Sequence, residues 1–199
     1  FKMAEKEFLS AIEIKKQNPD ALLNLGVIYL QTEKEKKAIE LLNKSLELNP
    51  FFTESIYNLG LCYKNLGDYT KAIECYKKAI KTNPNHLKSY NNLAVCYIVL
   101  NDFENAYNFL QQCLQKNSNY SHALNNLGSV YIALKKHSQA KNCFEKAYSL
   151  NKKLLNAGIK KIYLKRRSCD WSSEHEVTEL MKKSISSDES VSPWECLPM

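Results

Sequence analysis

The chain has 199 residues, of which 44% are hydrophobic and 25% are charged, and its formal net charge is +7. No apolar run approaches the roughly 18 residues that a membrane helix needs, and no secretory signal peptide opens the sequence. The composition agrees with a soluble intracellular protein, and we expect a cytoplasmic and/or nuclear location and no membrane partner.

The segment 1–18 indicates the second helix of a helix pair whose first helix is missing. Ala4, Phe8 and Ala11 form its apolar face at helical spacing. Pro19 follows and predicts the end of this helix. It lies seven residues before Gly26, whereas Pro50 and Pro84 lie ten residues before Gly60 and Ala94. The proline is therefore displaced within its repeat, although the 34-residue spacing is kept.

Four repeats of 34 residues follow. The stretch "NLGVIY" at 24–29 returns as "NLGLCY" at 58–63, "NLAVCY" at 92–97 and "NLGSVY" at 126–131. A period of 34 residues is typical of a helix-turn-helix solenoid unit. We assign the repeats to residues 19–52, 53–86, 87–120 and 121–154.

Each repeat predicts two amphipathic helices. In the second repeat, Ile56, Leu59 and Tyr63 share one helical face, "GD" at 67–68 predicts a turn, and a second apolar stripe follows before "NP" at 83–84. Glycine inside a helix costs about 1 kcal/mol relative to alanine. We expect close backbone packing to offset this cost where a small-residue series crosses an alanine series. The two series are Gly26, Gly60, Ala94 and Gly128, and Ala38, Ala72, Ala106 and Ala140.

An asparagine precedes the packed leucine in each repeat, about 100° around the helix from the buried stripe. These residues are Asn24, Asn58, Asn92 and Asn126. An asparagine amide offers donors and an acceptor that match a peptide backbone, so the series predicts a ladder that binds peptide. The alternative is that each asparagine bonds only a neighbouring helix or water.

After the repeats we expect a capping helix at 155–167 and a junction segment at 168–199. The dense basic cluster of the capping helix fits a solvated or domain-docking surface, or else a localisation or phosphate-binding patch; its residues are Lys160, Lys161, Lys165, Arg166 and Arg167. The other lysines are scattered and no base-stacking motif accompanies them, so we expect no nucleic-acid partner. In the junction, Ser173 and Glu176 predict a capping box that begins a short amphipathic helix.

Cysteines and histidines indicate neither a metal site nor a catalytic site. The seven cysteines contain no C-x-x-C pair and recur at repeat positions as small core residues, which predicts no disulfide framework or zinc site. The histidines are far apart in sequence and are expected to meet no Ser, Cys or carboxylate constellation; they are His86, His122, His137 and His175.

The repeat pattern resembles the tetratricopeptide repeat: Leu-Gly, Tyr three residues later, Ala nine after that, then an apolar residue and a terminal Pro. The usual early Trp is replaced by Leu22, Ile56, Tyr90 and Leu124. The resemblance implies an all-α fold, a right-handed superhelix of antiparallel helix pairs with a C-terminal helical junction segment.

The junction resembles that of O-linked N-acetylglucosamine transferases, between repeat superhelix and glycosyltransferase domain. The resemblance rests on Cys169, Asp170, Trp171, Ser192, Pro193 and Trp194. It implies a ladder that holds extended or disordered protein segments for a catalytic domain using UDP-N-acetylglucosamine. The chain ends at Met199 without such a domain, so we expect no cofactor and no catalytic residue here, and a substrate-recognition module inactive by itself.

The alternative function is a scaffold or co-chaperone module for protein–protein interaction. Chaperone-binding repeats resemble one another in a Lys and Asn clamp, one turn apart on a first helix. The corresponding pairs here are Leu23 with Val27, Tyr57 with Leu61, Asn91 with Val95 and Asn125 with Ser129. No repeat supplies the clamp, although a general assembly scaffold stays open.

Overall fold

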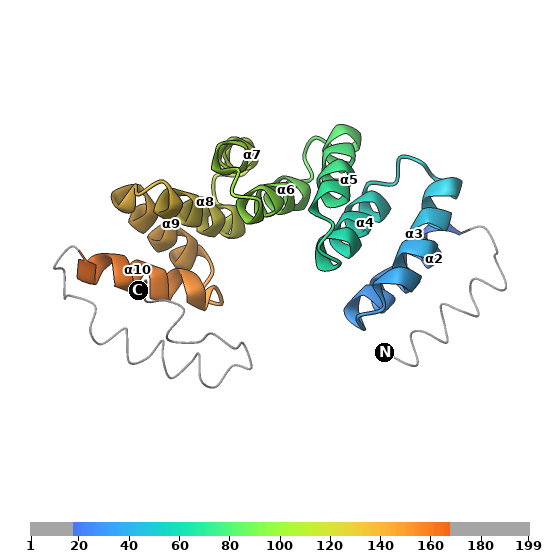
Figure 1. Ribbon diagram of the computed structural model, residues 1–199, viewed down its shortest axis with the longest axis horizontal. Helices are drawn as coiled ribbons and strands as arrows, with labels where there is room; N and C mark the ends of the chain where they lie inside the picture. The colour runs from blue at the N-terminus through green and yellow to red at the C-terminus, as the bar shows by residue number, and fades with distance from the viewer. Residues whose placement is uncertain (1–17, 168–199) are drawn as a thin grey trace. The chain divides into compact units, whose positions relative to one another are not determined.

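The computed structural model describes residues 18–167, and within this range every regular element is an α-helix (Figure 1). The helices are α2 (Pro19–Gln31), α3 (Glu35–Leu48), α4 (Thr53–Asn65), α5 (Tyr69–Thr82), α6 (Leu87–Val99), α7 (Phe103–Lys116), α8 (Ser121–Ala133), α9 (His137–Leu150) and α10 (Leu155–Arg167). The predicted all-α repeat fold is confirmed. The segment preceding Asn18 and the predicted junction at 168–199 lie outside the described residues.

Helix starts follow the sequence register. The first helices of the pairs begin at residues 19, 53, 87 and 121, and α10 begins at 155. Pro19 is therefore the first residue of α2, a role that was not assigned to it from the sequence. Its missing N–H costs nothing at this position, because the first N–H groups of a helix have no partner within it. Asn18 caps the helix: its Oδ1 accepts from the Asp20 N–H at 2.9 Å and the Ala21 N–H at 3.3 Å.

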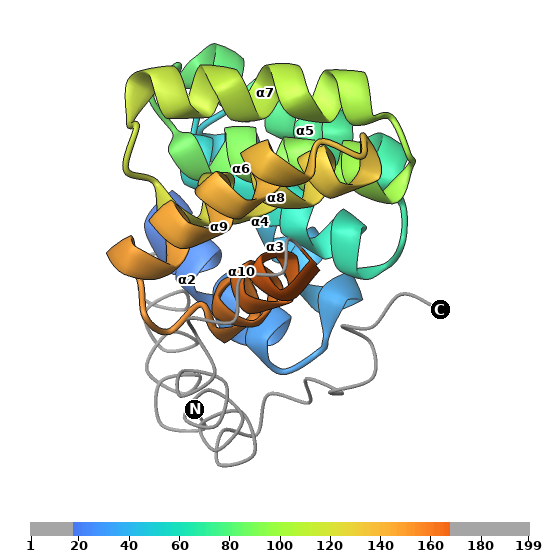
Figure 2. The same cartoon turned by 90° about the vertical axis from the view of Figure 1, so that its left-hand side faces the viewer.

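The chain forms two compact units, which divide between Cys96 and Tyr97 within α6. In unit 1, α2 packs against α3 and α4 against α5, and α3 also contacts α4. In unit 2, α8 packs against α9, which in turn contacts α10, and α7 contacts α8. The paired helices α8 and α9 lie side by side in both views (Figures 1 and 2).

Each helix pair turns through one residue in the left-handed conformation. These residues are Glu33 (φ 55°), Gly67 (φ 79°), Asn101 (φ 58°) and Lys135 (φ 58°). The next N–H then donates to the carbonyl five residues back, as from Asp68 to Tyr63 at 2.9 Å and from Lys136 to Tyr131 at 2.8 Å. This is the Schellman closure of a helix C-terminus, which glycine adopts with least strain.

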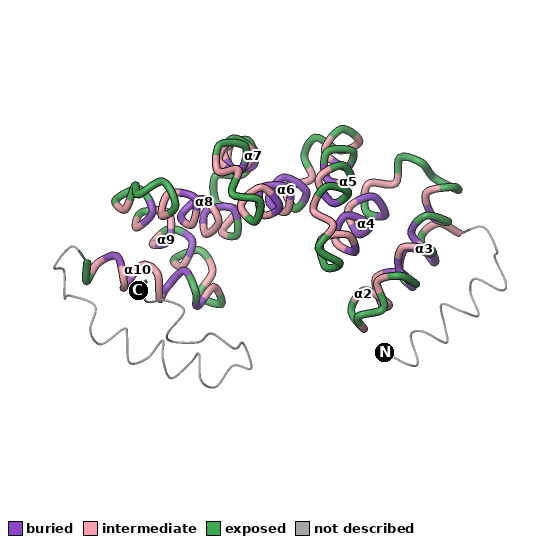
Figure 3. The backbone as a smooth tube through the Cα atoms, viewed as in Figure 1, coloured by how far each residue is buried: buried purple, intermediate pink, exposed green. Residues whose placement is uncertain are grey.

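The glycines of the first helices face large side chains of the second helices. A Cβ on Gly60 would lie 2.7 Å from Cε1 of Tyr76, and one on Gly128 would lie 2.7 Å from the Phe144 ring. Both rings are fully buried. Burial is concentrated on these facing surfaces while the opposite faces are exposed (Figure 3). The sequence predicts that these glycines face the alanine series; at Gly60 and Gly128 they face an aromatic ring instead, which corrects the expected partner.

Candidate functional site

The four predicted ladder asparagines differ in exposure. Asn24 on α2 is exposed, Asn92 on α6 and Asn126 on α8 are half-buried, and Asn58 on α4 is only 8% exposed. Unit 1 holds the first three and unit 2 holds Asn126. The asparagine position thus recurs in register on the four first helices, but neighbouring side chains bury the four asparagines to different degrees.

We call each asparagine of the ladder a rung. Two of these rungs form the same hydrogen bond to a carbonyl of their own helix. The Nδ2 of Asn58 donates to the Glu54 carbonyl at 2.8 Å, and the Nδ2 of Asn92 donates to the Lys88 carbonyl at 3.2 Å. Each bond reaches back four residues and fixes which side of the amide faces the helix. The Oδ1 atom is then the acceptor that each amide presents for a further N–H donor.

Tyr57 links two neighbouring first helices of unit 1. Its hydroxyl accepts a hydrogen bond from the Asn92 Nδ2 at 2.9 Å, so it joins α4 to α6 next to the rung at Asn58. Its ring lies 5.9 Å from the Tyr76 ring and 5.0 Å from the His86 ring, centroid to centroid. Tyr57 entered the sequence analysis only as a position where the chaperone-binding clamp is absent, although it directly precedes Asn58 of the ladder.

His86 corrects the expectation that the histidines meet no Ser or carboxylate. Its Nδ1 lies 2.7 Å from the Ser89 Oγ, and its Nε2 lies 3.3 Å from the Glu54 Oε1. The connection joins the start of α4 to the start of α6. These residues are separated by up to 35 positions in sequence, so only the repeat packing brings them together.

The Ser89–His86–Glu54 group is a structural connection and not a nucleophilic site. The Ser89 side chain is fully buried, so a substrate cannot reach its hydroxyl. Burial lowers the pKa of His86, and the Glu54 carboxylate opposes that shift. A neutral imidazole donates from Nε2 to Glu54 and accepts from Ser89 at Nδ1, which satisfies both ring nitrogens.

The five cysteines within residues 18–167 are free thiols. Cys62, Cys96 and Cys113 are buried, and Cys75 and Cys143 are half-buried. Burial raises the pKa of Cys62 to about 12 and that of Cys113 to about 11. Such thiols carry very little thiolate at neutral pH, and thiolate is the nucleophile and metal ligand. In the part of the chain that the structure describes, no cluster of His, Cys, Asp and Glu could hold a metal ion.

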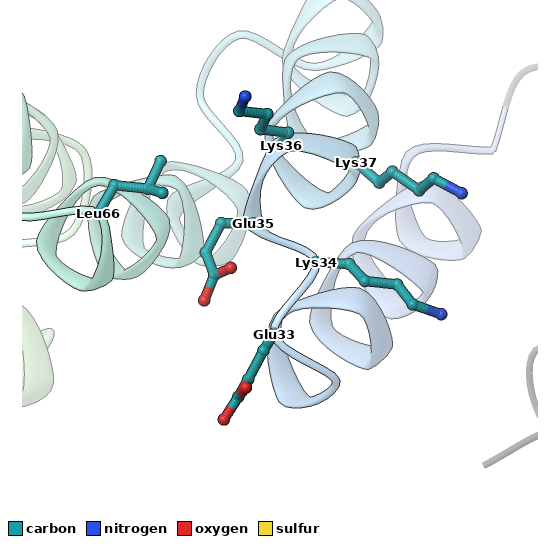
Figure 4. Close-up of a pocket in the computed structure, with 6 residues that line it drawn as sticks. All are labelled: Glu33, Lys34, Glu35, Lys36, Lys37 and Leu66. Carbon is teal, nitrogen blue, oxygen red and sulfur yellow. The ribbon is translucent and has the colours of Figure 1, made fainter.

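A shallow hollow of about 340 Å³ lies at the α2–α3 turn, away from the rungs. Glu33, Glu35 and Leu66 line it together with three lysines at 34, 36 and 37. The charged side chains point outward in several directions and do not converge on one point (Figure 4). Because a binding pocket needs convergent polar groups, this hollow does not compete with the ladder as a candidate site.

The repeats identify the class of protein. Models of the tetratricopeptide repeat match residues 19–52, 54–86 and 87–153. The chain therefore belongs to the tetratricopeptide repeat family, a class of helical scaffolds for protein interaction. No helix among residues 18–167 combines the length and apolar composition that crossing a membrane requires.

Solved structures support the same fold. PilF of Pseudomonas aeruginosa is 26% identical over 83% of this chain and 75% of its own, with a TM-score of 0.77. MamA from Desulfovibrio magneticus RS-1 is 20% identical over 85% of this chain and 97% of its own, with a TM-score of 0.69. YrrB, a repeat protein with an unusual peptide-binding site, is 18% identical over 89% and 90% of the two chains, with a TM-score of 0.64. No curated protein matches the sequence significantly.

Proposed function

We propose that the chain holds extended polypeptide along its first helices and serves as the substrate-binding segment of a glycosyltransferase similar to O-linked N-acetylglucosamine transferase. The observation that carries the proposal is the recurrence of one asparagine position in register on α2, α4, α6 and α8. The junction residues that point to this enzyme family lie outside the described residues, so that part of the proposal rests on sequence resemblance.

The amide orientations give the ladder a definite chemistry. Since the Nδ2 atoms of Asn58 and Asn92 donate to their own helices, the Oδ1 atoms would accept N–H groups of a bound peptide. Backbone N–H groups are present in every residue except proline, so such a ladder binds extended chains with little preference for their side chains. A disordered Ser- and Thr-rich segment is the kind of protein substrate that this arrangement accommodates.

On this proposal the nucleotide sugar that donates N-acetylglucosamine does not bind to this chain. UDP-N-acetylglucosamine would bind a catalytic domain of the parent enzyme, and this segment would need no cofactor. On this proposal the enzyme works in the cytoplasm and/or nucleus, where unmodified protein segments are available. The similarity to YrrB supports the peptide-binding half of the proposal, because that protein has a peptide-binding site on a repeat scaffold of the same fold.

The test is a titration of isotope-labelled protein with an unstructured peptide rich in Ser and Thr, followed by nuclear magnetic resonance. We expect the side-chain amide signals of Asn24, Asn58 and Asn92 to shift with a common dissociation constant. Asn43 and Asn142, which are exposed on the second helices α3 and α9, are matched controls and should not shift. If only signals of the second helices shift, the peptide binds there and not along the first helices, which would contradict the proposal.

A plain interaction scaffold is the second candidate, favoured by the match of the repeats to the general family models. Such a scaffold recognises the side chains of a particular partner segment. The two candidates separate in the same titration when the peptide sequence is scrambled: backbone binding tolerates the change, whereas recognition of side chains does not.

A further inference from the structure

Charge is distributed unevenly between the two units. The described residues of unit 1 carry ten basic and eight acidic side chains, a net charge of +2, whereas those of unit 2 carry twelve and three, a net charge of +9. Between residues 105 and 167, Glu145 is the single acidic residue. Unit 2 is therefore the part of the described chain that attracts an anionic partner most strongly.

The ladder position does not end at Asn126 but continues to Lys160 on α10, 34 residues later. The Lys160 Nζ donates to the Ser129 Oγ at 3.1 Å and lies 5.4 Å from the centre of the Phe144 ring. Ser129 follows Asn126 by three residues on α8, which places both on one helical face. A peptide that passes Asn126 and continues to the next repeat position would therefore meet a lysine where the 34-residue spacing predicts an asparagine.

We propose that this face of unit 2, formed by Asn126, Ser129 and Lys160, selects extended polypeptide segments that carry an acidic side chain. The proposal rests on the proposed function and adds a charge preference to it. The acidic side chain would pair with the Lys160 ammonium, while a backbone N–H beside it would bond the amide of Asn126. The half-buried setting of Lys160 strengthens such a pair relative to one in open water.

The surrounding charges favour a carboxylate on a peptide over a nucleic acid. Two other members of the basic cluster lie against protein groups: Lys165 lies 4.0 Å from the Glu145 carboxylate, and Lys161 lies over the Tyr148 ring at 5.8 Å. A nucleic-acid backbone also lacks the N–H donor that the neighbouring asparagine amide accepts, whereas an acidic peptide supplies the donor and the charge together.

The test measures binding of three labelled probes to the full chain by fluorescence anisotropy. The probes are a peptide of alternating Glu and Ser, the same peptide with Gln for each Glu, and oligouridylate. We expect the Glu peptide to bind tighter than the Gln peptide, and the difference to shrink as salt screens the ion pair. In Lys160→Met, which removes the ammonium and keeps an unbranched side chain, the Glu peptide should bind about 3- to 5-fold more weakly, the size of one ion pair near the surface.

Controls separate this inference from the function beneath it. Lys160→Arg should restore preference for the Glu peptide, and Lys153→Met, at an exposed lysine of the same unit, should leave it unchanged. Equal affinity for both peptides, unaltered in Lys160→Met, would overturn the charge preference while leaving peptide binding intact. Failure of both peptides to bind would overturn the proposed function as well. Tighter binding of oligouridylate, weakened by Lys160→Met, would replace the acidic peptide with a nucleic acid.

Discussion

Replacing Gly60 by alanine tests the packing that pairs the helices. The added Cβ would lie 2.7 Å from Cε1 and 3.0 Å from Cδ1 of Tyr76, whose ring is fully buried. Carbon atoms pack best at about 3.5 to 4.0 Å, so the ring would have to move by about 1 Å. Gly128→Ala creates the same conflict, at 2.7 Å from the Phe144 ring.

The expected loss follows from two opposing contributions. Overpacking a buried site costs about 1 to 3 kcal/mol, and a rigid buried ring belongs to the upper half of that range. Alanine recovers about 1 kcal/mol of helix propensity. Gly60→Ala and Gly128→Ala should therefore each lower the free energy of unfolding by about 1 to 2 kcal/mol. Gly26→Ala should be nearly neutral, because its Cβ would lie 3.1 Å from the Cγ of Leu42, a side chain that can shift.

Urea and thermal unfolding followed by circular dichroism measure these differences. A loss of about 1 kcal/mol corresponds to about 2 to 4 °C in the midpoint for a chain of this size. Tyr76→Leu should restore the stability lost in Gly60→Ala. The double variant places a leucine opposite the small residue, as in the first repeat, where Leu42 faces Gly26. Equal losses for Gly26→Ala and Gly60→Ala would refute the reasoning, because only one of them meets a ring.

Three further predictions concern turns, the core and pH. Lys135→Gly should raise the free energy of unfolding by up to about 1 kcal/mol and Gly67→Ala should lower it similarly, as measured in urea, because both positions have positive φ. Among the described residues the buried Tyr76 hydroxyl has no hydrogen-bond partner, so Tyr76→Phe should be neutral or stabilising by about 1 kcal/mol in thermal unfolding; a large loss would reveal a hidden partner. Burial lowers the pKa of His86, and Glu54 opposes that shift. The stability that the neutral His86 contributes is therefore present at pH values above 6.5, the ordinary pKa of histidine, and is lost as the pH falls. Urea unfolding from about pH 7.5 to about pH 5.5 should show a steeper loss for the wild type than for His86→Gln, and equal slopes would contradict this.

The sequence predicted the helices and their pairing because both depend on residues that recur in register. The small-residue series predicted a close crossing within each repeat, but it placed Gly60 opposite an alanine, whereas the structure places it against the ring of Tyr76. The role of Pro19 as the first residue of α2 was not predicted, because from the sequence this proline was considered only as a stop signal for the preceding segment.

Features that depend on contacts between repeats could not be predicted. The approach of Glu54 to His86 depends on how α4 lies against the start of α6, and single-chain periodicity does not contain that distance. Glu33 and Lys135 adopt the left-handed conformation although neither is a glycine, so no residue type indicated it. The hydrogen bonds of the Schellman closure impose this conformation. The ladder positions followed from spacing, but the orientation of each amide depends on carbonyls within its helix.

The most direct test of the central claim is the affinity of the triple variant Asn58→Ala, Asn92→Ala and Asn126→Ala for an extended Ser- and Thr-rich peptide, measured by calorimetry. The wild-type dissociation constant is expected in the high micromolar to millimolar range. Three lost hydrogen bonds of about 0.5 to 1.5 kcal/mol each predict binding at least about tenfold weaker. Thermal stability should change little, because the higher helix propensity of alanine offsets the lost side-chain bonds. The account predicts lost affinity in a stable protein, with Asn43→Ala and Asn142→Ala unaffected; retained affinity in a protein that unfolds at markedly lower temperature would contradict it.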